Sequence, residues 1–118
     1  MGIEDIVDFI VKYSPYKDRD LIKEYIALHI KYRTCIVICE DDELIAVARW
    51  NISPSGKIAF VLDTIIKEGY RNNGMMRRLI EKGTSVWKDV KYLAWEREWK
   101  YPDREQKIYS VKQLLKRR

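Results

Sequence analysis

The segment that decides the fold runs from residue 62 to residue 80 and reads Leu62-Asp63-Thr64-Ile65-Ile66-Lys67-Glu68-Gly69-Tyr70-Arg71-Asn72-Asn73-Gly74-Met75-Met76-Arg77-Arg78-Leu79-Ile80. An apolar run ends at Ile66, a polar loop follows, and apolar residues return at helical spacing after Gly74. A helix that starts directly after a loop leaves backbone amides without acceptors, and its dipole adds partial positive charge there. With Arg71 close by, this pattern favours an anion site such as a phosphate site, although loops that only reverse the chain share it.

The loop also resembles a known motif. Tyr70-Arg71-Asn72-Asn73-Gly74-Met75-Met76 is similar to the pyrophosphate motif of the GNAT acyltransferase superfamily, Arg/Gln-x-x-Gly-x-Gly/Ala preceded by an aromatic residue. Two positions depart from that pattern: Met76 replaces a small residue, and Glu68-Gly69 replaces a frequent Pro-acidic pair. The resemblance covers about residues 1–95 and implies an α+β, GNAT-like acyl-CoA N-acyltransferase fold. That fold has a mostly antiparallel mixed sheet flanked by helices, and its C-terminal part is shorter here than is usual for the family.

The resemblance implies where acetyl-CoA is held. The backbone of Ile66 is expected to hydrogen-bond the pantetheine arm, and two strands, 57–66 and 90–95, are expected to splay apart to admit it. The amides of the loop are expected to cradle the pyrophosphate; its residues are Arg71, Asn72, Asn73, Gly74, Met75 and Met76.

Acyl transfer to an amine benefits from a base that removes a proton and an acid that protonates the leaving thiolate. Asp63 is the candidate base, because it interrupts an apolar strand where desolvation raises a carboxyl pKa. The alternative is a structural role, paired with Arg49 or with a turn amide. Tyr109 is the candidate acid by its place in the chain, although no Tyr-x-x-x-Gly-Phe stretch is present and a core or surface role is the alternative. His29 lies on an apolar helical stripe, which is typical of a packed, hydrogen-bonded histidine.

Periodicity predicts the remaining elements. Apolar spacing predicts one helix over about 3–13, ended by Ser14-Pro15, and a second over about 20–32, capped by Asp18 or Asp20. Two β-branched runs predict a hairpin over 34–52 with its turn at 41–43. A third strand over 57–66, a helix over about 75–87 and a strand over 90–95 follow, and 106–109 and 110–116 predict a short strand and a helical turn capped by Ser110.

Composition sets limits on the class of protein. The 118 residues are enough for one domain with one core, which we place at about 1–96, followed by a basic segment over 97–118 with eight basic and three acidic residues. No apolar run approaches the roughly 20 residues of a membrane span, and no signal peptide is recognisable, so we expect a cytoplasmic protein without membrane contact. The two cysteines, Cys35 and Cys39, share a strand too far apart for a disulfide, and we expect buried thiols. With a single histidine we expect no metal site.

These observations lead to one hypothesis and one alternative. The chain is expected to be an N-acetyltransferase that moves acetyl from acetyl-CoA to an amine, with its acceptor wall completed by a homodimer or another partner. The alternative is a GNAT-like binding module without catalysis that contacts nucleic acid through the basic segment, where aromatic and basic side chains alternate.

Overall fold

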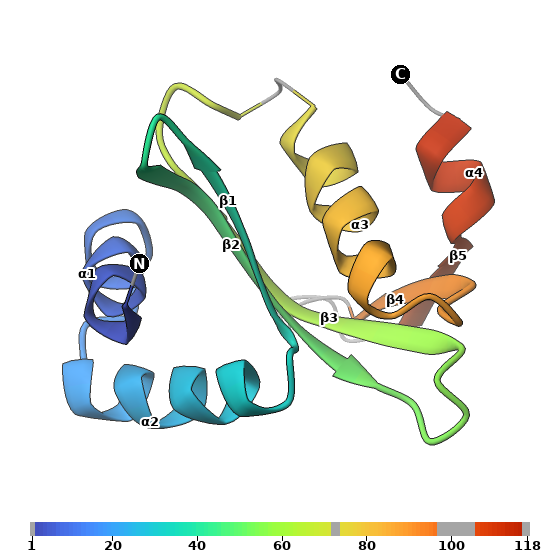
Figure 1. The fold of residues 1–118 in the computed structure, drawn as a ribbon, viewed down its shortest axis with the longest axis horizontal. Coiled ribbons are helices and arrows are strands. Elements are labelled where there is room, and N and C mark those ends of the chain that lie inside the picture. The colour runs from blue at the N-terminus through green and yellow to red at the C-terminus, as the bar shows by residue number, and fades with distance from the viewer. Residues whose placement is uncertain (1, 72–73, 97–105, 117–118) are drawn as a thin grey trace.

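The structure is a computed structural model that describes residues 2–71, 74–96 and 106–116. In chain order its elements are α1 (Ile3–Tyr13), α2 (Arg19–Lys31), β1 (Cys35–Glu40), β2 (Glu43–Ile52), β3 (Ile58–Ile66), α3 (Met75–Val86), β4 (Tyr92–Glu96), β5 (Gln106–Ser110) and α4 (Val111–Lys116) (Figure 1). Each helix and strand expected from the sequence is present, and its ends lie within two residues of the predicted ones.

The two N-terminal helices pack against each other, and single residues set where α1 ends and α2 begins (Figure 1). Ser14 closes α1, because its amide donates to the carbonyl of Ile10 and Pro15 cannot continue the helix. Asp18 caps α2 by accepting a hydrogen bond from the amide of Leu21, so the first of the two predicted caps is the correct one.

The sheet is mixed and has the strand order β1-β2-β3-β4-β5. Its first three strands and its last pair are antiparallel, whereas β4 runs parallel to β3 because α3 connects them. The β1–β2 hairpin turns on Asp41 and Asp42, whose φ angles of 50° and 62° suit a two-residue hairpin turn.

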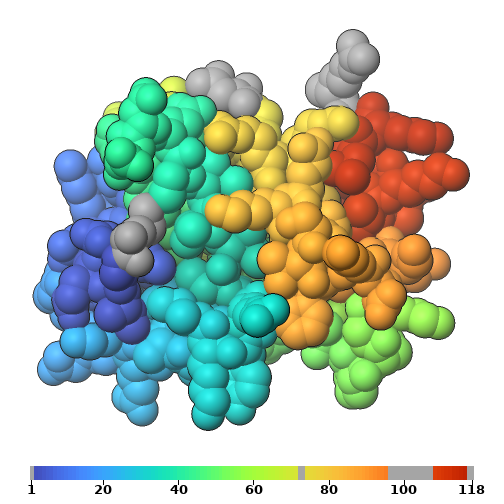
Figure 2. Space-filling view, viewed as in Figure 1, coloured from blue at the N-terminus to red at the C-terminus, as the bar shows by residue number. Residues whose placement is uncertain are grey.

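Helices pack against both faces of the sheet. Figure 2 shows α1 and α2, in blue and cyan, filling one side and α3 and α4, in yellow to red, filling the other. The core under α1 and α2 contains Ile10, Ile26 and Val47, and the core under α3 contains Trp50, Leu79 and Leu93. The sheet therefore needs apolar residues on both faces, which is why β2 is buried from Leu44 to Ala48 without alternation.

The C-terminal residues that the structure describes continue this fold. β5 pairs with β4, and α4 begins at Ser110, whose hydroxyl accepts a hydrogen bond from the amide of Gln113, as predicted. The apolar residues Val111, Leu114 and Leu115 pack on the core under α3. In the part of the chain that the structure describes, no helix combines the length and the apolar character needed to cross a membrane.

The cysteines differ from the expectation. No disulfide joins them, but only Cys35 is largely covered, and Cys39 is exposed. Cys39 is exposed because it lies near the end of β1, where it lines a surface cavity with Phe9 and Lys12 of α1.

Candidate active-site cleft

The cleft begins where β3 and β4 separate. Their parallel pairing consists of Ile58 with Tyr92, Ala59 with Leu93, and Phe60 with Ala94, and it goes no further. On the other edge of β3, Asp63 pairs with Arg49 but Val61 pairs with Trp50, so Leu62 is an extra residue in β3. Such a bulge bends a strand and increases its twist. The segment from Val61 to Ile66 therefore has no β4 partner among the described residues.

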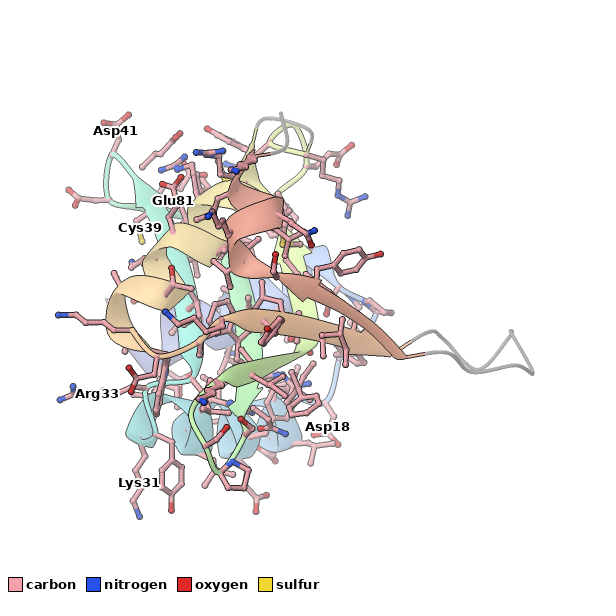
Figure 3. All side chains as sticks on the ribbon, turned by 90° about the vertical axis from the view of Figure 1, so that its right-hand side faces the viewer. Asp18, Lys31, Arg33, Cys39, Asp41 and Glu81 are labelled. Atoms are coloured by element: carbon pink, nitrogen blue, oxygen red, sulfur yellow. The ribbon has the colours of Figure 1, made fainter. Side chains whose placement is uncertain are left out.

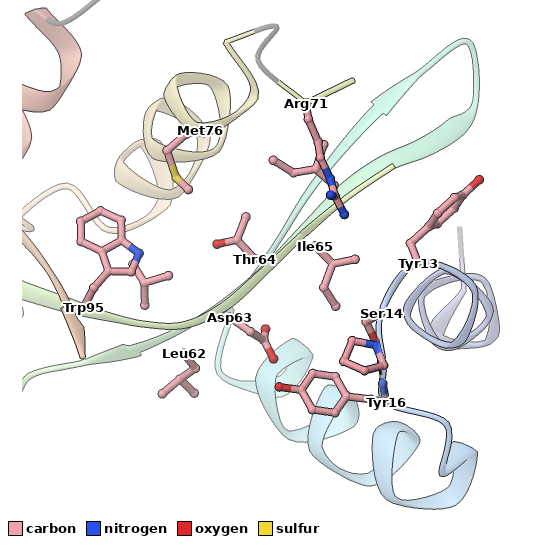
Figure 4. A pocket seen from close by; sticks show the side chains of 13 residues that line it. Tyr13, Ser14, Tyr16, Leu62, Asp63, Thr64, Ile65, Arg71, Met76 and Trp95 are labelled. Atoms are coloured by element: carbon pink, nitrogen blue, oxygen red, sulfur yellow. Dashed lines mark hydrogen bonds between the residues drawn. The ribbon is translucent and has the colours of Figure 1, made fainter. Parts of the chain in front are cut away.

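A cleft of about 540 Å³ occupies the space between the separated strands. Its floor is β3 from Val61 to Ile66, and its sides are Trp95 of β4, Met76 of α3, Arg71 of the loop, and the connection Tyr13–Tyr16 between α1 and α2. Figure 4 shows Met76 and Trp95 on one side of β3 and the side chains of the α1–α2 connection on the other. The two predicted splayed strands thus bound the cleft.

The N-terminus of α3 and Arg71 supply positive charge at one end of the cleft. Gly74 precedes the helix with a φ of 71°, a left-handed conformation that favours glycine. The first helical hydrogen bond runs from the amide of Arg78 to the carbonyl of Gly74, so the amides of Met75, Met76 and Arg77 have no acceptor within the helix. Arg71 forms no ion pair with the acidic residues that the structure describes.

The two methionines at this helix end have different roles in packing. The side chain of Met75 is buried in the core under α3, at 3% exposure, and Met76 is 38% exposed and faces the cleft. The position at which the family pattern has a small residue is therefore a cleft wall here. Asn72 and Asn73, the other two predicted loop ligands, lie outside the described residues.

Thr64 offers an unused polar atom on the floor of the cleft. Its hydroxyl oxygen is buried and has no hydrogen-bond partner in the part of the chain that the structure describes. A buried polar atom without a partner costs free energy, so a ligand that donates or accepts a hydrogen bond there relieves that cost. This atom, the unpaired edge of β3 and the helix end together fit a long ligand that carries amide groups and phosphates.

Asp63 is held by a guanidinium. Arg49 donates to one oxygen, Oδ2, from Nε at 2.9 Å and from Nη2 at 2.6 Å, and the ring of Tyr25 stacks 4.1 Å from the guanidinium carbon. This is the pairing with Arg49 that the sequence left as an alternative, and Asp63 nonetheless lines the cleft. Burial raises the pKa of Tyr25, and it raises the pKa of Cys35, the β1 neighbour of Arg49, to about 11.

Tyr109 and His29 lie outside the lining of the cleft. Tyr109 is on β5, and its ring meets Trp95 edge-on with centroids 5.8 Å apart, so one aromatic ring separates it from the cleft. His29 is buried, and its Nδ1 lies 2.7 Å from the hydroxyl of Thr34. The prediction of a packed, hydrogen-bonded histidine is confirmed.

The cleft therefore gathers four of the predicted site residues, namely Asp63, Ile66, Arg71 and Met76. Sequence reasoning missed Thr64, Trp95 and the α1–α2 connection. A lone hydroxyl in the apolar run before the loop was a signal for Thr64. Nothing in the sequence signals that residues 13–16 lie against β3, because that contact depends on how α1 packs.

The separated strands and the cleft that ends at a helix N-terminus define a domain with the GNAT-like acyl-CoA N-acyltransferase fold. The acetyltransferase (GNAT) family model matches residues 3–105, and the chain belongs to this family.

Solved structures agree with this assignment at the level of the fold. A candidate acetyltransferase from Pyrococcus horikoshii is 21% identical with a TM-score of 0.58, and the match covers 83% of this chain and 36% of that one. Ard1 from Thermoplasma volcanium is 15% identical with a TM-score of 0.62, and the match covers 84% of this chain and 69% of that one. GphF, a GNAT-like decarboxylase in complex with isobutyryl-CoA, is 11% identical with a TM-score of 0.59, and the match covers 85% of this chain and 64% of that one. A search of curated proteins gave no match.

Proposed function

We propose that this protein is an N-acetyltransferase that takes acetyl from acetyl-CoA and transfers it to an amine. The observation that supports this most strongly is the end of the β3–β4 pairing at Phe60 and Ala94, which leaves the edge of β3 facing a cleft with Arg71 and a helix N-terminus at one end. A similar fold that holds isobutyryl-CoA, in GphF, supports a CoA thioester as the ligand.

Different residues of the cleft would bind different parts of acetyl-CoA. Arg71 and the amides up to Met76 would bind the pyrophosphate, because phosphates accept several hydrogen bonds and a full positive charge strengthens them. The backbone of Ile66 and the hydroxyl of Thr64 would bind the amide groups of the pantetheine arm.

Acetyl-CoA supplies a thioester, whose C–S bond breaks as the acceptor nitrogen bonds to the acetyl carbon. One proton must leave the nitrogen, and one must reach the sulfur. Asp63 is our candidate for the first transfer, because both hydrogen bonds from Arg49 go to Oδ2 and Oδ1 has no described partner. Tyr109 stays the candidate for the second; since Trp95 separates it from the cleft, its proton would travel through water.

The test is a calorimetric titration of acetyl-CoA into the wild type and into Arg71→Ala. Losing one charged contact to a phosphate costs roughly 1.5–3 kcal/mol, so Arg71→Ala should bind about 10- to 100-fold more weakly. Arg78→Ala is the matched control, because Arg78 lies at the same end of α3 but pairs with Glu40 rather than lining the cleft. Gly74→Glu, which places a negative charge at the helix end, should abolish binding.

Binding to the wild type that Arg71→Ala weakens and Arg78→Ala leaves intact would support the cleft as the acyl-CoA site. The proposal fails if the wild type takes up no acetyl-CoA, or if both arginine variants bind as the wild type does.

A further inference from the structure

One face of the sheet is left open beyond β3. Ala59 and Leu93 point into the core under α3, so the residues that alternate with them point to the opposite side, where α1 and α2 lie. The main contacts of α1 and α2 with the sheet are to β1, β2 and β3, and Figure 1 shows both helices on the side of the molecule away from β4 and β5. Tyr92 and Ile108 are exposed there, and we call the residues Phe60, Leu62, Tyr92 and Ile108 the open sheet face.

A second apolar surface runs along α2. Leu21, Leu28 and Tyr32 are 57%, 54% and 57% exposed, and the half-buried Tyr25 lies between them at spacings of four, three and four residues. We call these four residues the α2 ridge. This spacing places them on one side of the helix, away from the buried residues Ile22, Ile26 and His29, and it is the spacing by which helices pair.

The two surfaces adjoin. Leu28 and Tyr32 share a cavity of about 320 Å³ with Asn51 and Ile52 at the end of β2. Asn51 pairs in the sheet with Phe60, so this cavity lies beside the open sheet face, with the polar Asn51 between the two apolar surfaces. Exposed apolar side chains grouped along one side of a helix, as in the α2 ridge, are typical of an interaction site.

The charges beside the ridge indicate what kind of partner fits. The N-terminal half of α2 carries Asp20 and Glu24, its last residue is Lys31, and Arg33 follows in the turn after it. Figure 3 labels Asp18, Lys31 and Arg33, which mark the two ends of the helix. None of these four forms an ion pair with a described residue. The basic residues of the N-terminal half are already engaged by α1, since Arg19 and Lys23 pair with Glu4.

We propose that a second copy of this chain docks on the α2 ridge, with the two α2 helices packed antiparallel about a two-fold axis. In that arrangement Leu21 meets Tyr32 of the second copy and Tyr25 meets Leu28 of the second copy. Glu24 and Lys31 lie on the same flank of the ridge, so Glu24 lies opposite Lys31 of the second copy. A surface that complements itself in both shape and charge is what an isologous dimer requires.

The dimer interface would lie close to the cleft, which Asp63 lines. Tyr25, at the centre of the ridge, stacks on Arg49, which in turn holds Asp63. The inference itself does not depend on acyl-CoA binding, because it stands on the two apolar surfaces and on the charges of α2.

The first experiment measures the mass of the protein in solution by sedimentation velocity or light scattering. The wild type should run at twice the chain mass of 14.2 kDa. Leu28→Glu places two charges at the centre of the symmetric interface, so it should weaken the dimer by roughly 100-fold or more and give monomers. Ile30→Glu is the matched control: Ile30 is also exposed on α2, at 44%, but it lies off the ridge, so this variant should stay dimeric.

A charge reversal tests the antiparallel order. Glu24→Lys should weaken the dimer, and adding Lys31→Glu should restore it, because the two changes re-create complementary pairs across the two-fold axis. A monomeric wild type, or a Leu28→Glu variant that stays dimeric, overturns the proposal. The acetyl-CoA titration is run on the same variants, so the failure of either proposal is seen without the other.

Discussion

At the scale of single residues, His29 predicts how stability depends on pH. It is the only histidine, and burial lowers its pKa below the ordinary value of about 6.5. Below about pH 6.5 the unfolded chain therefore takes up a proton that the folded chain does not, and the free energy of unfolding falls until the folded pKa is passed. Denaturant unfolding at a series of pH values should show this fall in the wild type and lack it in His29→Gln, which removes the titrating group. Equal pH dependence in the two proteins would contradict it.

Asp63 illustrates which properties of a site residue could be predicted from the sequence and which could not. The prediction that Asp63 is a site residue rested on an acidic side chain inside an apolar strand, and Asp63 does line the cleft. The sequence left open whether it acts as a base or pairs with Arg49, because Arg49 lies 14 residues away on β2. Arg49 reaches it only because the β2–β3 register sets the two side by side. Register is decided by which face each strand buries, and that is a property of the packed sheet rather than of either strand alone.

At the scale of elements, the contact between α3 and the sheet predicts how much stability is lost when a methyl group is added at Gly83. A Cβ on Gly83 would overlap the ring of Trp50, which is almost fully buried. Gly83→Ala gains about 1 kcal/mol of helix propensity but overpacks the core, and we expect a net loss of roughly 1–3 kcal/mol in the free energy of unfolding. Ser85→Ala, at an exposed position of the same helix, should be close to neutral.

A double-mutant cycle checks the cause of that loss. Trp50→Phe makes room beside Gly83, so Gly83→Ala should cost less in the Trp50→Phe background than in the wild type. The denaturation midpoint of the four proteins measures this coupling. Equal costs in both backgrounds would show that the overlap with Trp50 is not the reason.

The elements themselves were the part of the fold most accessible from sequence. Helical spacing, capping residues and turn residues are local, so they located α1, α2 and α3 to within two residues. The bulge at Leu62 and the register shift before Cys39 were not predicted, because an extra residue in one strand is defined only against its neighbour. The separation of β3 from β4 was expected only through the family resemblance.

At the scale of the whole molecule, the order of burial predicts the order of local unfolding. β2 lies between β1 and β3 and is buried by helices on both faces, whereas β5 pairs only with β4 and exposes Ile108. Amides that open only on global unfolding exchange slowest with solvent, so those of Ala46 and Ala48 should be the most protected and those of β5 should exchange orders of magnitude faster.

Hydrogen exchange of the wild type and of Leu28→Glu separates this gradient from the effect of the proposed dimer. If a second copy covers the α2 ridge and lies near the open sheet face, protection of β5 should fall in Leu28→Glu while β2 stays protected, because the core under α3 does not depend on the partner. Ile30→Glu should exchange like the wild type. A β5 strand that is as protected as β2 in monomeric Leu28→Glu would mean that the single chain stabilises this edge without a second copy, and the burial gradient would then be a poor guide to its dynamics.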